Sequence, residues 1–400
     1  MAINRPVGNS QSDRANHLDW LRILIVLMLI PYHTAIMFEK GNPLGWVNNS
    51  VSSSAATAFV QIMDQFQMPL LFAIAGIAAW FSLGSRTMKQ YFVERLGRLF
   101  MPLIFGALIV NVPIYYISVL YYHRGALYNN SYFIWYKTYL STMLFPWQRN
   151  WTPETLWFIW YLFIYSIGVL PLFLLLRKHI SNFRWVKFGE FFEKHGMSLL
   201  FLSAILPVLV QLYPPPNFHS VFQISYFIFF FIYGFILYSS KQIQHYIDRF
   251  GHWALIIGAV TIFVVILLII PDETNAPLGA VYWPALGKLG QYLYMILRGI
   301  SCWFSIIGLI FLARKWAEFS NRFLRYANEI VLPFYLLHAV FDIAVGYFVI
   351  PLHIGVLAKF AIICVSTLVA TLATIEIFKR FRVTRFLLGM RIKKRENQLP

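Results

Sequence analysis

Apolar stretches long enough to cross a bilayer recur along the whole chain. About 20 apolar residues in a helix cross a hydrocarbon core of roughly 30 Å. Only 12% of the residues are charged and the mean hydropathy is +0.63, whereas soluble domains average near 25% charged. We therefore predict an all-α fold, a polytopic integral membrane bundle of about ten transmembrane helices. The predicted spans are 18–37, 58–83, 99–122, 155–176, 197–213, 220–239, 252–270, 290–313, 327–350 and 354–378.

The distribution of Lys and Arg predicts the orientation. With a cytoplasmic N-terminus, the inward segments carry 25 of these residues and the outward segments carry five, as the positive-inside rule requires. Both termini are then cytoplasmic, in a multi-pass protein of the plasma or inner membrane. The predicted parts are a tail (1–17), the transmembrane domain (18–378) and a basic tail (379–400). The net charge of +17 follows from this asymmetry and indicates anionic membrane lipids as partners, with no nucleic acid.

Ionisable residues inside the predicted spans are the main functional signal. A charge at membrane depth costs several kcal/mol and marks a functional site by default. Arg22 and His33 both lie in the first span, 11 residues apart, or roughly 16 Å along a helix. Asp64 lies near the outward end of the second span. Further ionisable residues at or near membrane depth are Glu154, Arg298, His338, Asp342 and Glu376.

Motifs of soluble enzymes are missing from the sequence. It contains no phosphate-binding glycine loop, no paired cysteines and no nucleophile elbow. Cys302 and Cys364 both fall within predicted spans, and two isolated thiols give neither a disulfide framework nor the spacing of a metal site. We therefore expect no metal.

Five short motifs in order resemble the membrane-bound acyltransferase family 3. The first is Leu18-Asp19-Trp20-Leu21-Arg22 followed by His33. An Arg-x-x-Arg element follows the second span, with Arg95 and Arg98 as its arginines. The others are the Pro69–Gly76 stretch, the Leu-Trp-Phe-x-Trp-Tyr block at 156–161 and the Tyr-Leu-x-His block ending at His338. The resemblance covers essentially the whole chain.

Two departures narrow the resemblance. The O-acetylase branch often carries a soluble domain after the bundle, and this sequence stops at residue 400. That branch also tends to have a histidine before the fourth-span block, where this chain has Glu154-Thr155. Both points favour the shorter, glucan biosynthesis protein C-like branch.

The resemblance implies transfer of an acyl group, of acetyl or succinyl type, to an extracytoplasmic carbohydrate acceptor. Acyl-CoA would be the co-substrate, entering from the cytoplasm. Histidine suits the base that takes the hydroxyl proton, because its unperturbed pKa lies near neutrality. His33 is the first candidate and His338 the second. Asp64 is a candidate to orient the imidazole or to bind the sugar.

Arg95 and Arg98 would hold CoA phosphates, because guanidinium groups bind phosphate oxygens in pairs and residues three apart on an α-helix share a face. Arg22 would guide the pantetheine arm.

Structural interpretations of the same residues stay open. His33 and His338 fit helix-packing histidines, Asp64 fits a solvated carboxylate, and the Arg95–Arg98 pair fits ordinary positive-inside charge. Arg22 with Asp19 fits a structural ion pair. A different functional class, a secondary transporter or flippase, would use buried ionisable residues for coupling. No internal repeat relates 1–200 to 201–400, which disfavours that class. The sequence does not determine the oligomeric state.

Overall fold

The structure is a computed structural model of the whole chain. It describes residues 15–39, 46–122, 131–144, 154–180, 194, 197–212, 221–269 and 287–391. The predicted tail 1–17 lies mostly outside these residues, as does 392–400 of the basic tail.

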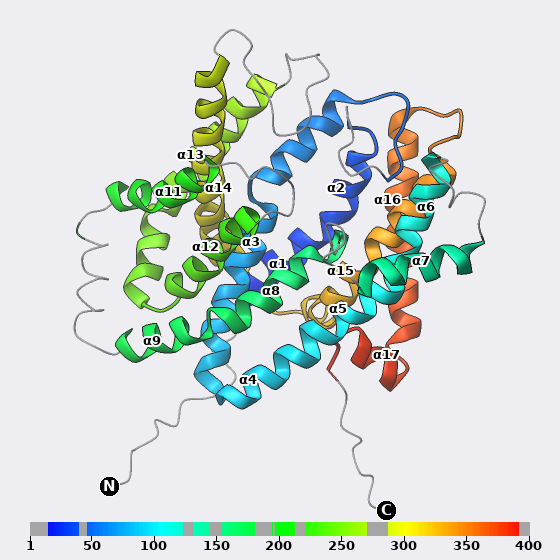
Figure 1. The fold of residues 1–400 in the computed structure, drawn as a ribbon. Helices are drawn as coiled ribbons and strands as arrows, with labels where there is room; N and C mark the ends of the chain where they lie inside the picture. Colours follow the sequence, from blue (N-terminus) through cyan, green and yellow to red (C-terminus); the bar gives the residue numbers. More distant parts are fainter. Residues whose placement is uncertain are drawn as a thin grey trace, which may run out of the picture.

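Every regular element among the described residues is helical, which confirms the predicted all-α fold (Figure 1). The elements α1 to α7 are α1 (Asn16–Leu27), α2 (Leu29–Ile36), α3 (Ser54–Ser85), α4 (Met88–Arg95), the π-helix η1 (Leu96–Phe100), α5 (Met101–Phe105), the π-helix η2 (Gly106–Val110), α6 (Val112–Tyr122) and α7 (Tyr132–Leu144). The remaining elements are the 3₁₀ turn η4 (Glu154–Leu156), α8 (Trp157–Gly168), α9 (Leu170–Ile180), α11 (Met197–Gln211), α12 (Val221–Leu237), α13 (Lys241–Ile269), α14 (Gly287–Trp316), α15 (Arg322–Val349), α16 (Val356–Phe378) and α17 (Arg382–Leu387).

Seven helical segments of the described chain are long and apolar enough to cross a membrane. An eighth is α8 with α9, if this pair, bent by 49°, forms one broken span. Each of the ten predicted spans is helical, but two are short. Within the described residues, α11 has 15 residues, or about 22 Å at 1.5 Å per residue, and Tyr226–Leu237 of α12 is a shorter apolar helix.

The first predicted span is broken where its proline requires it. Pro31 has no N–H to donate to the carbonyl of Leu27, and its ring clashes with that carbonyl. Accordingly, α1 ends at Leu27 and α2 begins at Leu29, after Met28. The break sets Tyr32 and His33 on a short separate helix.

The third predicted span departs from a regular α-helix in two places. The π-helix η1 overlaps its start and the π-helix η2 lies within it. The i→i+5 bonding of such helices is rare and is frequently found at functional sites. Tyr139 and Tyr136 of α7 donate hydrogen bonds to the carbonyls of Ala107 and Leu108 in η2, at 3.1 and 2.9 Å. The aromatic segment α7 thus packs on the bundle.

Two glycines allow α3 and α12 to pack backbone to backbone. A Cβ on Gly76 would lie 1.9 Å from the carbonyl oxygen of Phe231, and one on Gly234 would lie 1.9 Å from that of Ala73. Small residues permit such close approach between membrane helices. Around this contact, Phe72, Phe231 and Phe235 are buried in the main hydrophobic core.

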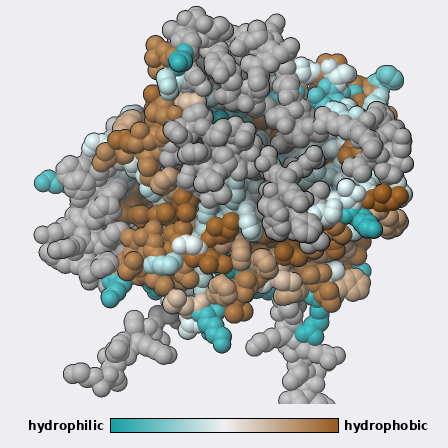
Figure 2. Space-filling model, viewed as in Figure 1, coloured by the Kyte–Doolittle hydropathy of each residue, from teal (hydrophilic) through white to brown (hydrophobic). Residues whose placement is uncertain are grey.

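The periphery of the bundle is apolar. Val260 and Phe263 of α13 are exposed, as are Leu357 and Val365 of α16. Figure 2 shows hydrophobic residues spread broadly over the face in view. Such surfaces suit contact with lipid tails, since a helix satisfies its own backbone hydrogen bonds there.

Candidate active site

Two histidines that are far apart in the sequence lie side by side in the bundle. The ring centroids of His33 in α2 and His338 in α15 are 5.3 Å apart, with the planes tilted by 35°. His338 is 1% exposed, whereas His33 is only partly buried. Both were predicted as candidate bases, and the fold brings them together.

Backbone carbonyls fix the tautomer of His338. Its Nδ1 lies 2.8 Å from the carbonyl oxygen of Tyr335 and 3.2 Å from that of Phe334. Because a carbonyl oxygen only accepts hydrogen bonds, Nδ1 carries the proton, and Nε2 of the neutral ring carries a lone pair. Nε2 is buried and has no hydrogen-bond partner among the described residues.

Aromatic and polar residues surround His33. The rings of Tyr32 and Trp46 lie 5.2 and 5.5 Å from it, and its Nδ1 has no hydrogen-bond partner in the described chain. The next residue, Thr34, donates a 2.7 Å hydrogen bond to Oδ1 of Asp342. Together His33, Thr34, His338 and Asp342 form what we call the histidine cluster.

Asp342 is the acidic residue of the histidine cluster, and it is fully buried. It is 0% exposed. Its Oδ1 also accepts a 3.4 Å hydrogen bond from Thr367 of α16, while Oδ2 has no hydrogen-bond partner among the described residues. From the sequence, Asp342 is predicted as an ionisable residue at membrane depth, with no catalytic or binding role assigned to it. Its spacing of four residues from His338 was the available signal, because such residues share a helix face.

Asp64 lies beside the histidine cluster on α3. It accepts a 2.6 Å hydrogen bond from the hydroxyl of Tyr32 and interacts electrostatically with Arg298 of α14. The neighbouring Gln65 accepts a 3.2 Å hydrogen bond from Ser301 of α14. The structure therefore places Asp64 against Tyr32, the residue before the predicted base, and its described hydrogen bond is made to Tyr32 and not to an imidazole.

Arg22 lies where α1 meets α15. Its guanidinium donates to Asp19 at 2.9 Å and to Asn328 of α15. Its side chain is 33% exposed. These contacts fit the structural interpretation of the residue.

Arg95 and Arg98 form a second polar group, the arginine cluster, together with Arg86 and Glu94. The guanidinium of Arg95 lies over the ring of Tyr91, 4.7 Å from its centroid. Glu94 pairs with Arg98 at 3.3 Å and with Arg86 at 3.0 Å. The expectation of a shared α-helical face needs correction, because Arg98 lies in the π-helix η1, where the turn is wider than in an α-helix.

The C-terminal segment packs against the arginine cluster. Gly389, at φ +69°, has the backbone oxygen of Arg98 3.0 Å from where its Cβ would be. Figure 1 shows α4 and α17 at the same end of the bundle. Arg385 of α17 donates a 2.7 Å hydrogen bond to Glu329, so a further basic residue lies at this end of the bundle.

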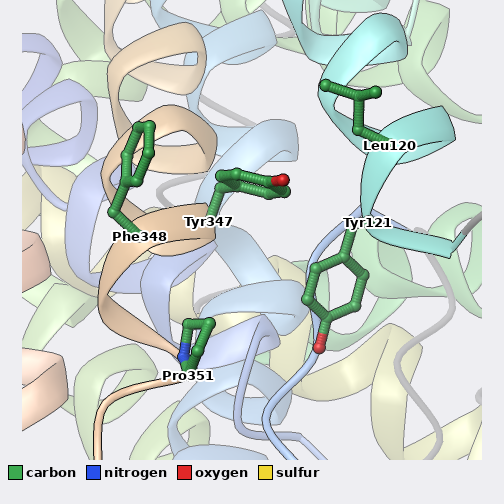
Figure 3. A pocket seen from close by; sticks show the side chains of 5 residues that line it. All are labelled: Leu120, Tyr121, Tyr347, Phe348 and Pro351. Atoms are coloured by element: carbon green, nitrogen blue, oxygen red, sulfur yellow. The ribbon is translucent and has the colours of Figure 1, made fainter.

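An open pocket lies near the C-terminal ends of α6 and α15. It has a volume of about 360 Å³ and is lined by Leu120, Tyr121, Tyr347, Phe348 and Pro351 (Figure 3). Tyr121 and Tyr347 pack against the same hydrophobic group as Trp46, whose ring contacts His33. The pocket therefore borders a hydrophobic group that also contacts the histidine cluster, through Trp46.

This arrangement is rich in hydrogen-bond acceptors. Nε2 of His338 accepts, and Oδ2 of Asp342 accepts when ionised. A ligand that complements these atoms carries donors such as hydroxyl groups. Among the described residues, no group of three or more His, Cys, Asp or Glu is placed to hold a metal ion.

The family described as "Acyltransferase domain" matches residues 16–376 of this chain. The chain therefore belongs to this acyltransferase family, as its motifs predict, and the histidine and arginine clusters both lie within the matched region.

The curated relatives include glucans biosynthesis protein C from Escherichia coli K12 and from its strains DH10B and MC4100/BW2952. Each is 23% identical over 235 residues, which cover 56% of this chain and 58% of the relative. The matched region thus spans little more than half the length of these relatives. No solved structure matches the chain.

Proposed function

We propose that this protein transfers an acyl group, of acetyl or succinyl type, from cytoplasmic acyl-CoA to a hydroxyl group of an extracytoplasmic carbohydrate. The family supports acyl transfer, and the relatives named for glucan biosynthesis support a carbohydrate acceptor. The observation that carries the proposal is the pairing of His33 with His338, whose fixed tautomer leaves Nε2 as an acceptor inside the bundle.

The proposed reaction balances without any further reagent. The acceptor hydroxyl gives its proton to an imidazole nitrogen while its oxygen attacks the thioester carbon. The carbon–sulfur bond then breaks, the new ester forms, and the CoA thiolate takes the proton from the imidazolium. A positioned base of this kind typically contributes 10²–10⁴-fold to the rate.

The proposed donor site is the arginine cluster. CoA carries phosphate groups that guanidinium groups bind strongly. Arg95 ends α4 and Arg98 lies in η1, and α4 lies at the same end of the bundle as α17. The open aromatic pocket at the ends of α6 and α15 is the proposed approach of the carbohydrate, because tyrosine rings offer an apolar face with a polar tip. The predicted site also includes Asp64, near the acceptor, and Arg22, for which a contact with the donor and a structural ion pair with Asp19 are alternatives.

The proposed topology has ten spans and two cytoplasmic termini, in the plasma or inner membrane. It is supported by the ratio of 25 to five in Lys and Arg placement and by the helix found at each predicted span. The transmembrane domain would cover 18–378 between the two tails, with the basic tail on anionic lipid headgroups.

The test uses the purified full-length protein in lipid nanodiscs, supplied with acetyl-CoA or succinyl-CoA and a glucan acceptor. Release of free CoA should require the acceptor, and mass spectrometry should find the acylated glucan. CoA release that does not depend on any carbohydrate, or its complete absence with every donor and acceptor pair, would contradict the proposal. A transporter would move a substrate into liposomes without consuming acyl-CoA.

A further inference from the structure

The buried carboxylate of Asp342 has no charged partner among the described residues. It is 0% exposed, and the described hydrogen bonds to it come from Thr34 and Thr367, both to Oδ1. Two neutral hydroxyl groups compensate a buried charge only in part, because removing an ionised group from water costs far more free energy than removing a neutral polar group does. Oδ2 of this residue has no partner in the described part of the chain.

Asp342 is tied to both histidines. It follows His338 by four residues on α15, so the two side chains lie on one helix face, roughly 5–6 Å apart at Cβ. Its bond to Thr34 fixes it against α2, immediately after His33. Nδ1 of His33, Nε2 of His338 and Oδ2 of Asp342 are thus three buried polar atoms without partners, all in the same cluster.

We infer that Asp342 is the positioning carboxylate of the histidine pair. From the sequence alone, Asp64 was the candidate for this role. The inference rests on the proposed acyl transfer. When an imidazole takes the hydroxyl proton, a cation forms in a site with little water, and a fixed carboxylate nearby stabilises it. The inference requires the carboxylate of Asp342 to be ionised when the imidazolium forms, as the carboxylate of a serine-protease triad is.

Asp64 is less suited to this role because its charge is engaged elsewhere. It accepts from Tyr32 at 2.6 Å and interacts electrostatically with Arg298. Asp342 has no such cation beside it among the described residues. Lys359 of α16 points elsewhere, with its ammonium group donating to Asn49 at 2.9 Å and to the carbonyl of Ile350 at 2.5 Å.

The elements packed against α15 around Asp342 contribute few titratable groups. Cys364 of α16 lies close by, with its sulfur 3.5 Å from Oγ1 of Thr34. The η2 segment has no titratable side chain, and α6 has only tyrosines. Asp19 and Arg22 of α1 lie further along α15, at Asn328. Among the described side chains, the acidic, basic or thiol groups at this part of α15 besides Asp342 are therefore His33, His338 and Cys364.

The test compares pH–rate profiles of Asp342→Asn, Asp64→Asn and wild-type protein. Asparagine keeps an oxygen for Thr34 but removes the charge. We expect Asp342→Asn to lower kcat by about 10²-fold or more, on the pattern of the carboxylate in catalytic triads, and to move the acidic limb of the kcat profile to lower pH. Asp248→Asn is the matched control, because that exposed carboxylate pairs with Arg314 on α13 and α14, and its profile should match the wild type.

A second pair of variants keeps the inference testable if Asp342→Asn does not fold. Thr34→Val removes the 2.7 Å bond that holds the carboxylate, and it should lower kcat, with rescue by Thr34→Ser. The inference would be overturned if Asp342→Asn had the wild-type kcat and an unchanged acidic limb of the kcat profile. It would also be overturned if Thr34→Val had the wild-type kcat, or if the acidic limb moved only in Asp64→Asn. Each of these results presupposes active wild-type protein, whereas failure of the proposed function would appear as wild-type protein without acyl transfer.

Discussion

The histidine cluster and the arginine cluster differ in how their polar groups are compensated. In the histidine cluster, His338 and Asp342 are 1% and 0% exposed, and each keeps a buried polar atom without a hydrogen-bond partner among the described residues. In the arginine cluster, Nε of Arg95 is likewise buried without a hydrogen-bond partner among the described residues, but the side chain of Arg98 is 43% exposed and Glu94 pairs with two guanidinium groups.

Because of this difference, the geometry of the two clusters supports a functional role to different degrees. A buried polar atom without a partner costs roughly 1–3 kcal/mol of stability. Several such atoms in one place therefore indicate a site that is kept for its function and not for its stability. Exposed ion pairs contribute about 0–1 kcal/mol and fit ordinary surface charge. The geometry of the histidine cluster therefore supports a chemical role, while the arginine cluster depends more on the family for its interpretation.

The largest expected effect tests the histidine cluster. His33→Ala should lower turnover per folded molecule by about 10²–10⁴-fold, the typical contribution of a general base, with CoA affinity unchanged. The measurement is CoA release by purified protein, with thermal melting to establish the folded fraction. The control is His252→Ala, since that histidine is exposed on α13. Turnover near that of the wild type would remove His33 from the mechanism and leave His338 as the better candidate.

The pairing of His33 with His338 shows what a single sequence could and could not predict. The apolar stretches and the distribution of charge predicted an all-helical membrane fold, and a helix covers each predicted span. Both histidines were recognised because ionisable groups are expensive in hydrocarbon. Their contact depends on how α2 packs on α15, which links residues 305 positions apart and has no local signal in the sequence.

Asp64 and Asp342 show the same limit for the carboxylates. Asp64 was selected because it is closer to His33 in the sequence. In the structure both carboxylates are bonded to the His33 helix, Asp64 through Tyr32 and Asp342 through Thr34, but only Asp342 also shares a helix with His338. The π-helix at Leu96–Phe100 was also unpredictable, because hydrophobic periodicity over five residues does not distinguish it from an α-helix. Local chemistry identified the residue types, whereas tertiary packing decided which of them meet.

The second prediction tests the arginine cluster directly. The double variant Arg95→Ala with Arg98→Ala should weaken CoA binding by about 1.5–3 kcal/mol for each charged hydrogen bond lost, or roughly 10-fold or more. Isothermal titration with CoA measures this change. Arg382→Ala is the matched control, since this exposed arginine begins α17 at the same end of the bundle. If the control lost as much CoA affinity as the double variant, or if the double variant lost none, the arginine cluster would be ordinary positive-inside charge and not a CoA site.

The third prediction separates the two interpretations of Arg22. Its bonds to Asp19 and Asn328 tie α1 to α15, so Arg22→Gln should lower the melting temperature by a few degrees, as the loss of about 1–2 kcal/mol does in a protein of this size or smaller. Turnover per folded molecule should stay near that of the wild type, and Asn328→Ala should give a similar melting shift. A raised KM for acyl-CoA with unchanged melting would instead show that Arg22 contacts the donor.

The smallest expected effect concerns Glu39, just after α2, where another buried polar atom lacks a partner. Glu39 is 2% exposed and its Oε2 is unpaired among the described residues. Burial, with repulsion from Asp64 as the second cause, raises the pKa of Glu39 to about 8 from its usual 4.5. The folded state therefore favours the protonated carboxyl, so this contribution to stability is complete below about pH 4.5 and is lost as the pH rises through 8.

Glu39→Gln should therefore flatten the fall in melting temperature between about pH 5 and pH 8.5. Glutamine keeps an oxygen for the 3.4 Å bond from Gln61 and cannot ionise, so the variant should melt a few degrees above the wild type at the alkaline end. Melting of both proteins in the same nanodiscs at closely spaced pH values measures the difference, with Asp248→Asn as the control on an exposed carboxylate. Parallel curves for Glu39→Gln and the wild type would mean that Glu39 is solvated or compensated in the membrane, which would weaken the argument that unpaired polar atoms beside the histidine cluster carry a cost.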